Sequence, residues 1–327
     1  MQYYDTQREK LKSQRCSTCH QEIYQQWQKS SHAKAFSNKL FYHAYLREPQ
    51  GWCLNCHAPL WKYRGTSMRA YYSYRKEKEP IMAEGVNCAT CHLRDGVIYT
   101  AKAPSTKAEQ CIYPVKQDKA LGETRFCANC HQFNFPQEHT PHVVYGSVPM
   151  QNVVQEFENT IWHKQGKTCQ SCHYKFARHS KMTSHNREEL AKNLQVRFAY
   201  LQDAEGIEKY VQVFVSFEKL GHHFPTGDLF RILEIRVLDA NKRLVGSQLL
   251  QKSVRVADRK LLFDSTLKPK VGERGAKQEI WIPVKQKPKY CEVIYHYQGK
   301  IENRLRNKLS KQELQAVLFS QECFVPM

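Results

Sequence analysis

Five short segments of the sequence share one pattern: two cysteines separated by two residues and followed at once by a histidine. The ten cysteines are Cys16, Cys19, Cys53, Cys56, Cys88, Cys91, Cys127, Cys130, Cys169 and Cys172, and the five histidines are His20, His57, His92, His131 and His173. A Cys-x-x-Cys pair alone fits a zinc half-site, a redox dithiol or a haem anchor, whereas the adjoining histidine is typical of c-type haem attachment. Paired zinc ribbons have no need of that histidine. The sequence therefore predicts five covalently bound haems c.

The spacing suits this chemistry. Two thiols three positions apart can reach the two vinyl groups along one edge of a porphyrin, and the next residue can ligate the iron. Three cysteines remain: Cys111, Cys291 and Cys323. In an oxidising compartment we expect a disulfide between Cys291 and Cys323, with two buried thiols as the alternative. We expect Cys111 to be a solitary buried thiol, with a thiolate axial ligand as the alternative.

Ten further histidines could supply the second axial ligand that bis-histidine coordination of five irons requires. His32 comes twelve residues after the first motif histidine. On a continuous helix over Gln21 to Phe36 it would lie about 18 Å along the axis, so we expect it to ligate a neighbouring haem. For the fourth motif either His139 or His142 could serve, and we assign His142. The histidines expected to be structural or exposed are His43, His163, His223 and His296.

The elements that must position these residues change character near residue 190. The motifs begin 35 to 42 residues apart, and the residues between them are mainly polar and have a helix-like pattern. This predicts a mainly helical, loop-rich domain over residues 1–190. Beyond it, segments with period-two alternation of apolar residues predict an antiparallel β-sandwich of about seven strands over residues 191–327. An amphipathic helix near Ser310 to Phe319 is expected to close it. The clearest predicted strands are Tyr210 to Phe217, Arg231 to Leu238, Glu279 to Val284 and Glu292 to Tyr297. The fold class is therefore α+β.

The charge balance indicates the kind of partner. With 50 Lys and Arg against 31 Asp and Glu, the chain carries a net charge of +19. Five ferric haems with about ten propionates would leave about +14, so the surface stays basic and suits redox partners with acidic docking surfaces. The basic residues are not accompanied by a basic helix, a phosphate-binding loop or a stacking motif, so nucleic acid is not an expected partner. No apolar stretch is long enough to cross a bilayer.

Four segments resemble the cytochrome c-554 family and related multihaem cytochromes. RCSTCHQEIYQQWQKSSHAKAF, from Arg15 to Phe36, is similar to the family's opening, and EGVNCATCH, from Glu84 to His92, to its Gly-Val-x-Cys-x-x-Cys-His segment. CQSCH, with the histidines after it, resembles the last haem site of related cytochromes, and GHHFPTG, from Gly221 to Gly227, a signature of β-domains attached to them. The distal ligands that this resemblance implies are His179, His185 and His222.

The resemblance implies an electron carrier that shuttles electrons between redox partners in the periplasm or outside the cell. Its cofactor chemistry requires export, and we expect a signal or anchor segment to be missing from this numbering, because the first residues are polar. Two alternatives remain open: an enzyme with one open-coordinate haem acting on a small nitrogen or sulfur species, and a subunit of an extracellular cytochrome filament. We favour the carrier over the enzyme. The electron donor and acceptor, the pairing of distal histidines with haems and the oligomeric state are left open.

Overall fold

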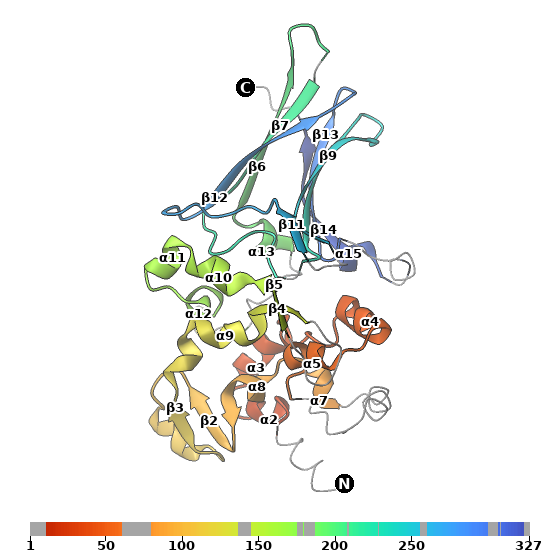
Figure 1. Cartoon of the computed structure of the whole chain (residues 1–327). Helices are drawn as coiled ribbons and strands as arrows, with labels where there is room; N and C mark the ends of the chain where they lie inside the picture. The colour runs from red at the N-terminus through yellow and green to blue at the C-terminus, as the bar shows by residue number, and fades with distance from the viewer. Residues whose placement is uncertain are drawn as a thin grey trace. The chain divides into compact units, whose positions relative to one another are not determined.

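The computed structural model describes the chain as two compact units (Figure 1). The first, the motif unit, comprises residues 1–146 and 167–183, and the second, the β unit, comprises residues 147–166 and 184–327. The described residues are 11–60, 80–136, 145–174, 179, 187–207, 209–227, 229–255, 260–299, 307 and 309–323.

The motif unit is built from short helices and a small sheet. Its helices are α2 (Gln14–Ser17), α3 (Gln21–Gln28), α4 (Lys39–Arg47), α5 (Gly51–His57), α7 (Pro80–Ala83), α8 (Cys88–His92), α9 (Thr124–His131) and α12 (Cys169–His173), with 3-10 turns η1 (Thr106–Gln110) and η2 (Lys119–Gly122). Strands β1 (Leu93–Arg94), β2 (Val97–Thr100) and β3 (Val115–Gln117) form the sheet. Among its described residues, one buried apolar cluster consists of Phe36, Tyr45, Leu54, Ala58 and Met82.

The β unit contains two antiparallel sheets, and their strands alternate as predicted. One sheet has the order β12 (Ala276–Pro283), β7 (Lys209–Phe217), β6 (Leu194–Gln202), and the other has the order β14 (Gln315–Glu322), β13 (Tyr290–His296), β8 (Ile232–Leu238), β9 (Leu244–Leu250). A hairpin of β10 (Lys252–Arg255) and β11 (Lys260–Asp264) and the short helices α10 (Val153–Glu158), α11 (Ile161–Lys164), α13 (Arg187–Ala191) and α15 (Lys311–Leu314) complete it. Strand β5 (Tyr145–Asn152) pairs with β4 (Gln132–Pro136) and contains the division between the units.

The two sheets of the β unit share a buried apolar core. Val211, Val213 and Val215 on β7 are at most 1% exposed, and Leu233 and Ile235 on β8 are fully buried. Successive side chains of a strand point to opposite faces, so these period-two sets each cover one face. Gly246 on β9 approaches β12 so closely that a Cβ atom there would lie 2.8 Å from the Ile282 side chain. The sheets therefore pack face to face, and the mixed α+β class is confirmed.

Two predicted helices are wrong in extent. The segment Ser310 to Phe319 begins with a capping box, but its helix ends at Leu314, and residues from Gln315 onward pair with β13 as strand β14. Ala316 and Leu318 are buried at period two, so burial against the sheet decides the outcome there. The helix predicted to reach Phe36 ends at Gln28.

The reason for this early end is local. The Ser30 hydroxyl oxygen accepts a hydrogen bond from the Ala33 backbone N–H and forms a turn that competes with the helix. The distance of about 18 Å along a continuous helix therefore does not apply to His32.

Residues 147–166, which lie between the fourth and fifth motifs in the sequence, belong to the β unit. Trp162 on α11 donates its indole N–H to the Arg274 carbonyl oxygen, and the Arg274 guanidinium lies 5.7 Å from the centre of the Trp162 ring. We expected a single boundary near residue 190, whereas the compact units interleave: the chain passes between them after Gly146, Gly166 and Thr183.

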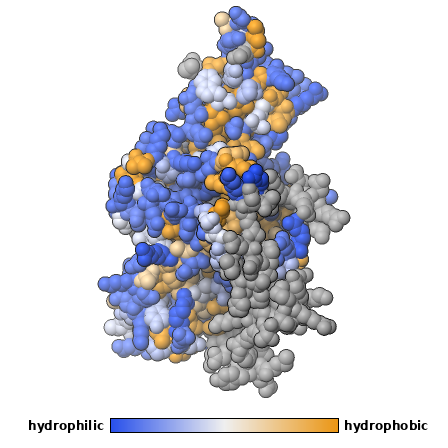
Figure 2. Space-filling view, viewed as in Figure 1, coloured by the Kyte–Doolittle hydropathy of each residue, from blue (hydrophilic) through white to orange (hydrophobic). Residues whose placement is uncertain are grey.

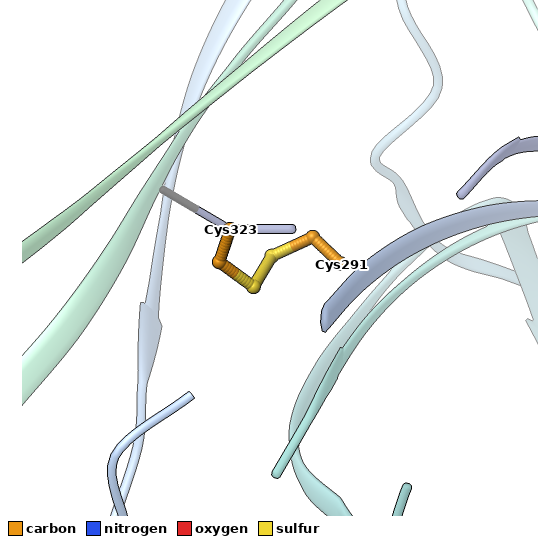
Figure 3. Close-up of a disulfide and its surroundings, with 2 residues drawn as sticks. All are labelled: Cys291 and Cys323. Carbon is orange, nitrogen blue, oxygen red and sulfur yellow. A yellow bond between two sulfur atoms is a disulfide. The ribbon is translucent and has the colours of Figure 1, made fainter. Parts of the chain in front are cut away.

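The β unit contains a disulfide between Cys291 and Cys323 (Figure 3), as expected. Both cysteines are fully buried, and the bond ties the end of β14 to the start of β13.

On the face seen in Figure 2, hydrophilic residues predominate and hydrophobic ones form smaller patches between them. Within the described residues no helix is both long and apolar enough to span a membrane.

Candidate functional site

The motif cysteines lie on single helical turns that end at the motif histidine. This holds for α5, α8, α9 and α12, while the first motif spans α2 and the turn that leads to His20 at the start of α3. Positions i and i+3 share one helix face, so each turn presents both thiols on the same side. Asn87 starts α8 by accepting a hydrogen bond from the Thr90 N–H at 3.0 Å, and Thr168 caps α12 in the same way.

None of the ten motif cysteines, all of which lie in the described part of the chain, is in a disulfide, although the same chain forms one elsewhere. Thiols from different motifs make hydrogen bonds with one another: Cys16 with Cys88, Cys56 with Cys130, and Cys127 with Cys169. The hydrogen bond with Cys16 lowers the pKa of Cys88 to about 7, and burial raises the pKa of Cys91 to about 11. Within the described ranges, no group of three or more His, Cys, Asp or Glu side chains converges as a metal-ion site. Ten thiols arranged in pairs and outside any disulfide fit thioether attachment.

Two motif imidazoles are oriented by backbone carbonyl groups. His57 donates its Nδ1–H to the Ala35 oxygen at 2.7 Å, and His92 donates its Nδ1–H to the Tyr99 oxygen at 2.9 Å. A hydrogen bond of this kind fixes the tautomer in which Nε2 carries the lone pair for a metal. Both rings are thus held in a tautomer that suits metal binding through Nε2.

Two other imidazoles face motif imidazoles at the spacing of axial ligands. The His32 ring centre lies 6.2 Å from that of His131, and the His179 ring centre lies 6.4 Å from that of His92. With a metal–nitrogen bond of about 2.0 to 2.1 Å and roughly 1.1 Å from ring nitrogen to ring centre, trans imidazoles are about 6.2 Å apart. Each pair therefore has the ring separation that two imidazoles bound to one metal ion would have.

The surroundings of His32 keep it neutral. Burial, and after it the neighbouring His131, His173 and His179, together lower its pKa to about 4. The Tyr174 hydroxyl forms a hydrogen bond with its Nδ1 at 3.1 Å. Neutral imidazole is the form that binds a metal.

The turn that carries His32 packs directly against the segment before the third motif. The Val86 N–H donates to the His32 carbonyl oxygen at 2.9 Å, and the Trp27 indole N–H donates to the Val86 oxygen at 2.9 Å. Gly85 has a positive φ of +60°, and a Cβ atom on it would lie 2.4 Å from the His32 carbonyl oxygen. Only glycine fits this approach of two backbones.

In the β unit, His222 lies on the Gly221 to Gly227 loop. Its Nδ1–H donates to the His223 carbonyl oxygen at 2.9 Å, the same orientation as in His57 and His92. Burial lowers the pKa of His222, which favours neutral imidazole. The neighbouring His223 ring faces two carboxylates instead, with Nδ1 3.4 Å from Asp264 and 3.6 Å from Glu156.

The remaining sequence-based assignments have different outcomes. His139, His142 and His185 lie outside the described residues. His296 donates from Nε2 to Glu234 at 2.7 Å, and His163 packs edge-on against Phe157, both consistent with structural roles. The prediction of a buried Cys111 thiol is wrong: it is exposed, because it ends the surface turn η1.

Gly85, Tyr174 and Glu156 are positioned at the candidate ligands and were not found from the sequence. Gly85 lies in the EGVNCATCH segment, and the conformational freedom of glycine was the one sequence signal that could have indicated its role. Tyr174 and Glu156 lie far in sequence from the histidines that they contact, and no local pattern marks them.

A family model matches the N-terminal part of the chain. Residues 15–93 match the model of the family described as cytochrome c554 and c-prime, which confirms the resemblance of the first and third motif segments. No curated protein matches the chain.

A solved structure extends the likeness over the whole chain. The crystal structure of a penta-heme cytochrome c552 from Thermochromatium tepidum matches with a TM-score of 0.65 and 19% sequence identity, over 96% of this chain and 97% of that one. The chain therefore shares its fold with that protein. The two matches support the predicted cofactor, haem c.

Proposed function

We propose that this protein is an electron-transfer cytochrome with five haems c, one on each Cys-x-x-Cys-His turn. The proposal rests on two pairs of imidazoles, His32 with His131 and His92 with His179. In each pair the distance between the ring centres is the one expected for two ligands of one iron. The ten motif thiols, which lie outside the disulfide, and the shared fold with a penta-heme cytochrome c552 support it. Haem, when bound, supplies reversible one-electron chemistry.

The chain's own residues would hold each haem. The motif cysteines form the thioethers, the motif histidines are the proximal ligands, and His32, His142, His179, His185 and His222 are the distal ligands. In this assignment His32 closes the fourth-motif site and His179 the third-motif site, so both join parts of the chain that are distant in sequence. His142 would then serve one of the other three irons and not the fourth-motif iron, for which the sequence suggested it. Because all five irons receive two histidines, the protein has no open position for a substrate, which favours a carrier over an enzyme.

The thiol contacts suggest the order in which the haem edges meet. Cys16 with Cys88 joins the first and third motifs, Cys56 with Cys130 the second and fourth, and Cys127 with Cys169 the fourth and fifth. Cys130 also lies close enough to Cys91 to influence it electrostatically, which connects the third motif to the fourth. The fourth haem would then be the branch point, because it would adjoin the second, third and fifth haems.

The working environment follows from the same chemistry. We propose a location outside the cytoplasm, because c-type attachment is completed after export, and redox partners with acidic docking surfaces, because the chain carries a net charge of +19.

Intact mass and spectroscopy test this function together. We expect five haem additions, with Cys111 as the one thiol still open to alkylation in the unfolded, unreduced protein. We also expect a wholly low-spin ferric spectrum and a reduced spectrum that carbon monoxide does not change. Four additions would contradict the five-haem assignment. A high-spin fraction near one haem in five would favour the enzyme alternative instead.

A further inference from the structure

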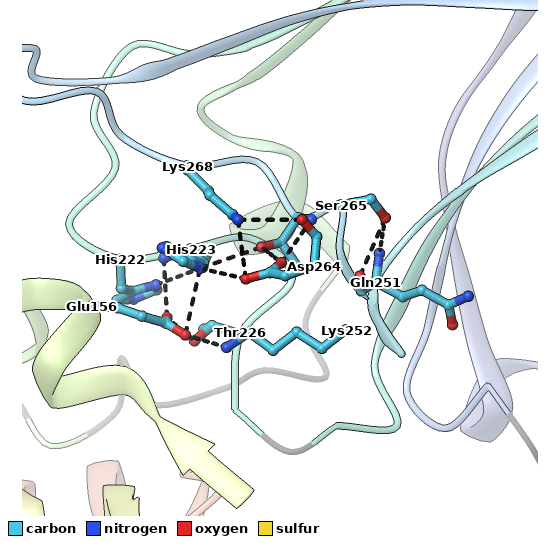
Figure 4. Close-up of polar contacts among 10 residues, drawn as sticks. Glu156, His222, His223, Thr226, Gln251, Lys252, Asp264, Ser265 and Lys268 are labelled. Carbon is cyan, nitrogen blue, oxygen red and sulfur yellow. Dashed lines mark hydrogen bonds and ion pairs between the residues drawn. The ribbon is translucent and has the colours of Figure 1, made fainter. Parts of the chain in front are cut away.

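A polar cluster in the β unit surrounds the loop that carries His222 (Figure 4). It draws side chains from α10, β10 and the residues in and after β11, and none of them belongs to a Cys-x-x-Cys-His motif. The inference below concerns what this cluster does for His222, and it rests on the proposed role of His222 as a distal haem ligand.

The backbone of His223 links His222 to the cluster. Its carbonyl oxygen accepts the Nδ1–H of His222 at 2.9 Å, and its N–H donates to the Glu156 carboxylate at 3.2 Å. The His222 ring is therefore oriented by the carbonyl group of a residue whose own N–H is held by Glu156.

Glu156 is unusual in its burial. The residue is 4% exposed, and its side chain 1%, whereas Glu158 on the same short helix is exposed. A carboxylate is buried at a high cost unless charges and hydrogen bonds compensate it. Here the Lys252 ammonium group pairs with it, and the Thr226 hydroxyl donates to it at 3.2 Å. Glu156 thus grips the loop at both His223 and Thr226.

The His223 ring lies 3.6 Å from Glu156 and is also held by a second carboxylate. Its Nδ1 lies 3.4 Å from the Asp264 carboxylate and 3.3 Å from the Thr266 hydroxyl, and Lys268 pairs with the same carboxylate at 3.3 Å. In this arrangement the second histidine of the loop is tied into the cluster. His222 is the one of the two that is oriented through a backbone carbonyl, as the motif ligands His57 and His92 are.

We infer that Glu156 is a positioning residue for the haem ligand His222, acting through the backbone of His223. Its oxygens accept hydrogen bonds from the loop, and its charge is balanced by Lys252. Partners that orient a metal-ligating histidine are typically worth a factor of about 10 to 100 in metal affinity, and we expect an effect of that size on the bond between His222 and iron.

Two double variants of the holoprotein test this. Glu156→Gln with Lys252→Met keeps an acceptor oxygen for the loop, whereas Glu156→Met with Lys252→Met removes it, and neither leaves a buried charge unpaired. We expect the Met/Met protein to bind carbon monoxide at one reduced haem in five, with a ferric high-spin signal of the same proportion. The Gln/Met protein and the Glu158→Ala control are expected to match the wild type. Circular dichroism checks that all the proteins keep the β unit's strand signal.

His222→Ala separates the two levels of the argument. If that variant opens one haem while the two double variants behave alike, His222 remains a ligand and the role of Glu156 is refuted. If His222→Ala leaves the spectrum unchanged, the ligand assignment itself is refuted, and the inference about Glu156 is refuted with it.

Discussion

Replacement of Gly85 by alanine tests whether the His32 turn is placed by the third-motif segment. The added Cβ atom would lie 2.4 Å from the His32 carbonyl oxygen and 3.0 Å from the Ala35 backbone nitrogen. Both neighbours are backbone atoms, so the turn itself must move. We expect His32 to leave its position opposite His131 and one low-spin haem to become partly high-spin.

The magnitude follows from two terms. Alanine at a positive φ costs about 1–2 kcal/mol, and an atom forced into a packed site costs about 1–3 kcal/mol more. Gly206 provides the matched control: its φ is +69°, close to the +60° of Gly85, and a Cβ atom there has nothing within 4 Å. Gly206→Ala therefore carries only the first term. The difference of about 1–3 kcal/mol, applied to the ligand bond, corresponds to roughly 5- to 150-fold weaker closure by His32.

The assay is carbon monoxide titration of the reduced holoproteins, with electron paramagnetic resonance of the ferric forms. Gly85→Ala should show one accessible haem and Gly206→Ala none. Equal behaviour of the two variants, with both folded, would falsify the view that the Gly85 approach positions His32.

Two further predictions concern the β unit. The His296 hydrogen bond holds the pKa of Glu234 below its usual value, so this carboxylate stabilises the fold above the unfolded-state pKa near 4.5, and the stability is lost as the pH falls below it. Glu234→Gln should flatten the pH dependence of the β unit's thermal midpoint below about pH 4.5, and an unchanged slope would contradict the assignment. Replacing both Cys291 and Cys323, which lie 32 residues apart, by alanine should lower the free energy of unfolding by about 3–4 kcal/mol in urea denaturation; a loss under about 1 kcal/mol would show that the closed loop adds little.

Covalent chemistry and strand periodicity were predictable from the sequence because both are local signals. The Cys-x-x-Cys-His turns need only consecutive residues, and the alternation of Val211, Val213 and Val215 directly reports a buried sheet face. The family match over residues 15–93 supports the resemblance that the motif segments indicated.

The ends of elements and the partners of His32 were not predictable in this way. The Ser30 turn ends α3 through one side-chain hydrogen bond, and β14 replaces a helix because β13 offers it a pairing edge. Both outcomes depend on contacts that short windows of sequence do not contain. The same is true of Tyr174, which reaches His32 across 142 positions of the chain.

Because the two units interleave along the sequence, the β unit is not a single C-terminal segment. Residues 147–166 precede the fifth motif in sequence, yet Glu156 binds a loop near residue 223, and Trp162 binds Arg274. The fifth-motif segment, residues 167–183, is therefore attached at both ends to residues of the β unit. A fragment that starts at residue 191 would lack Glu156 and leave Lys252 without this carboxylate, so it is not equivalent to the β unit. The β unit is thus joined to the haem-binding sequence through three passages of the chain, and its role should be studied by point substitutions in the complete protein.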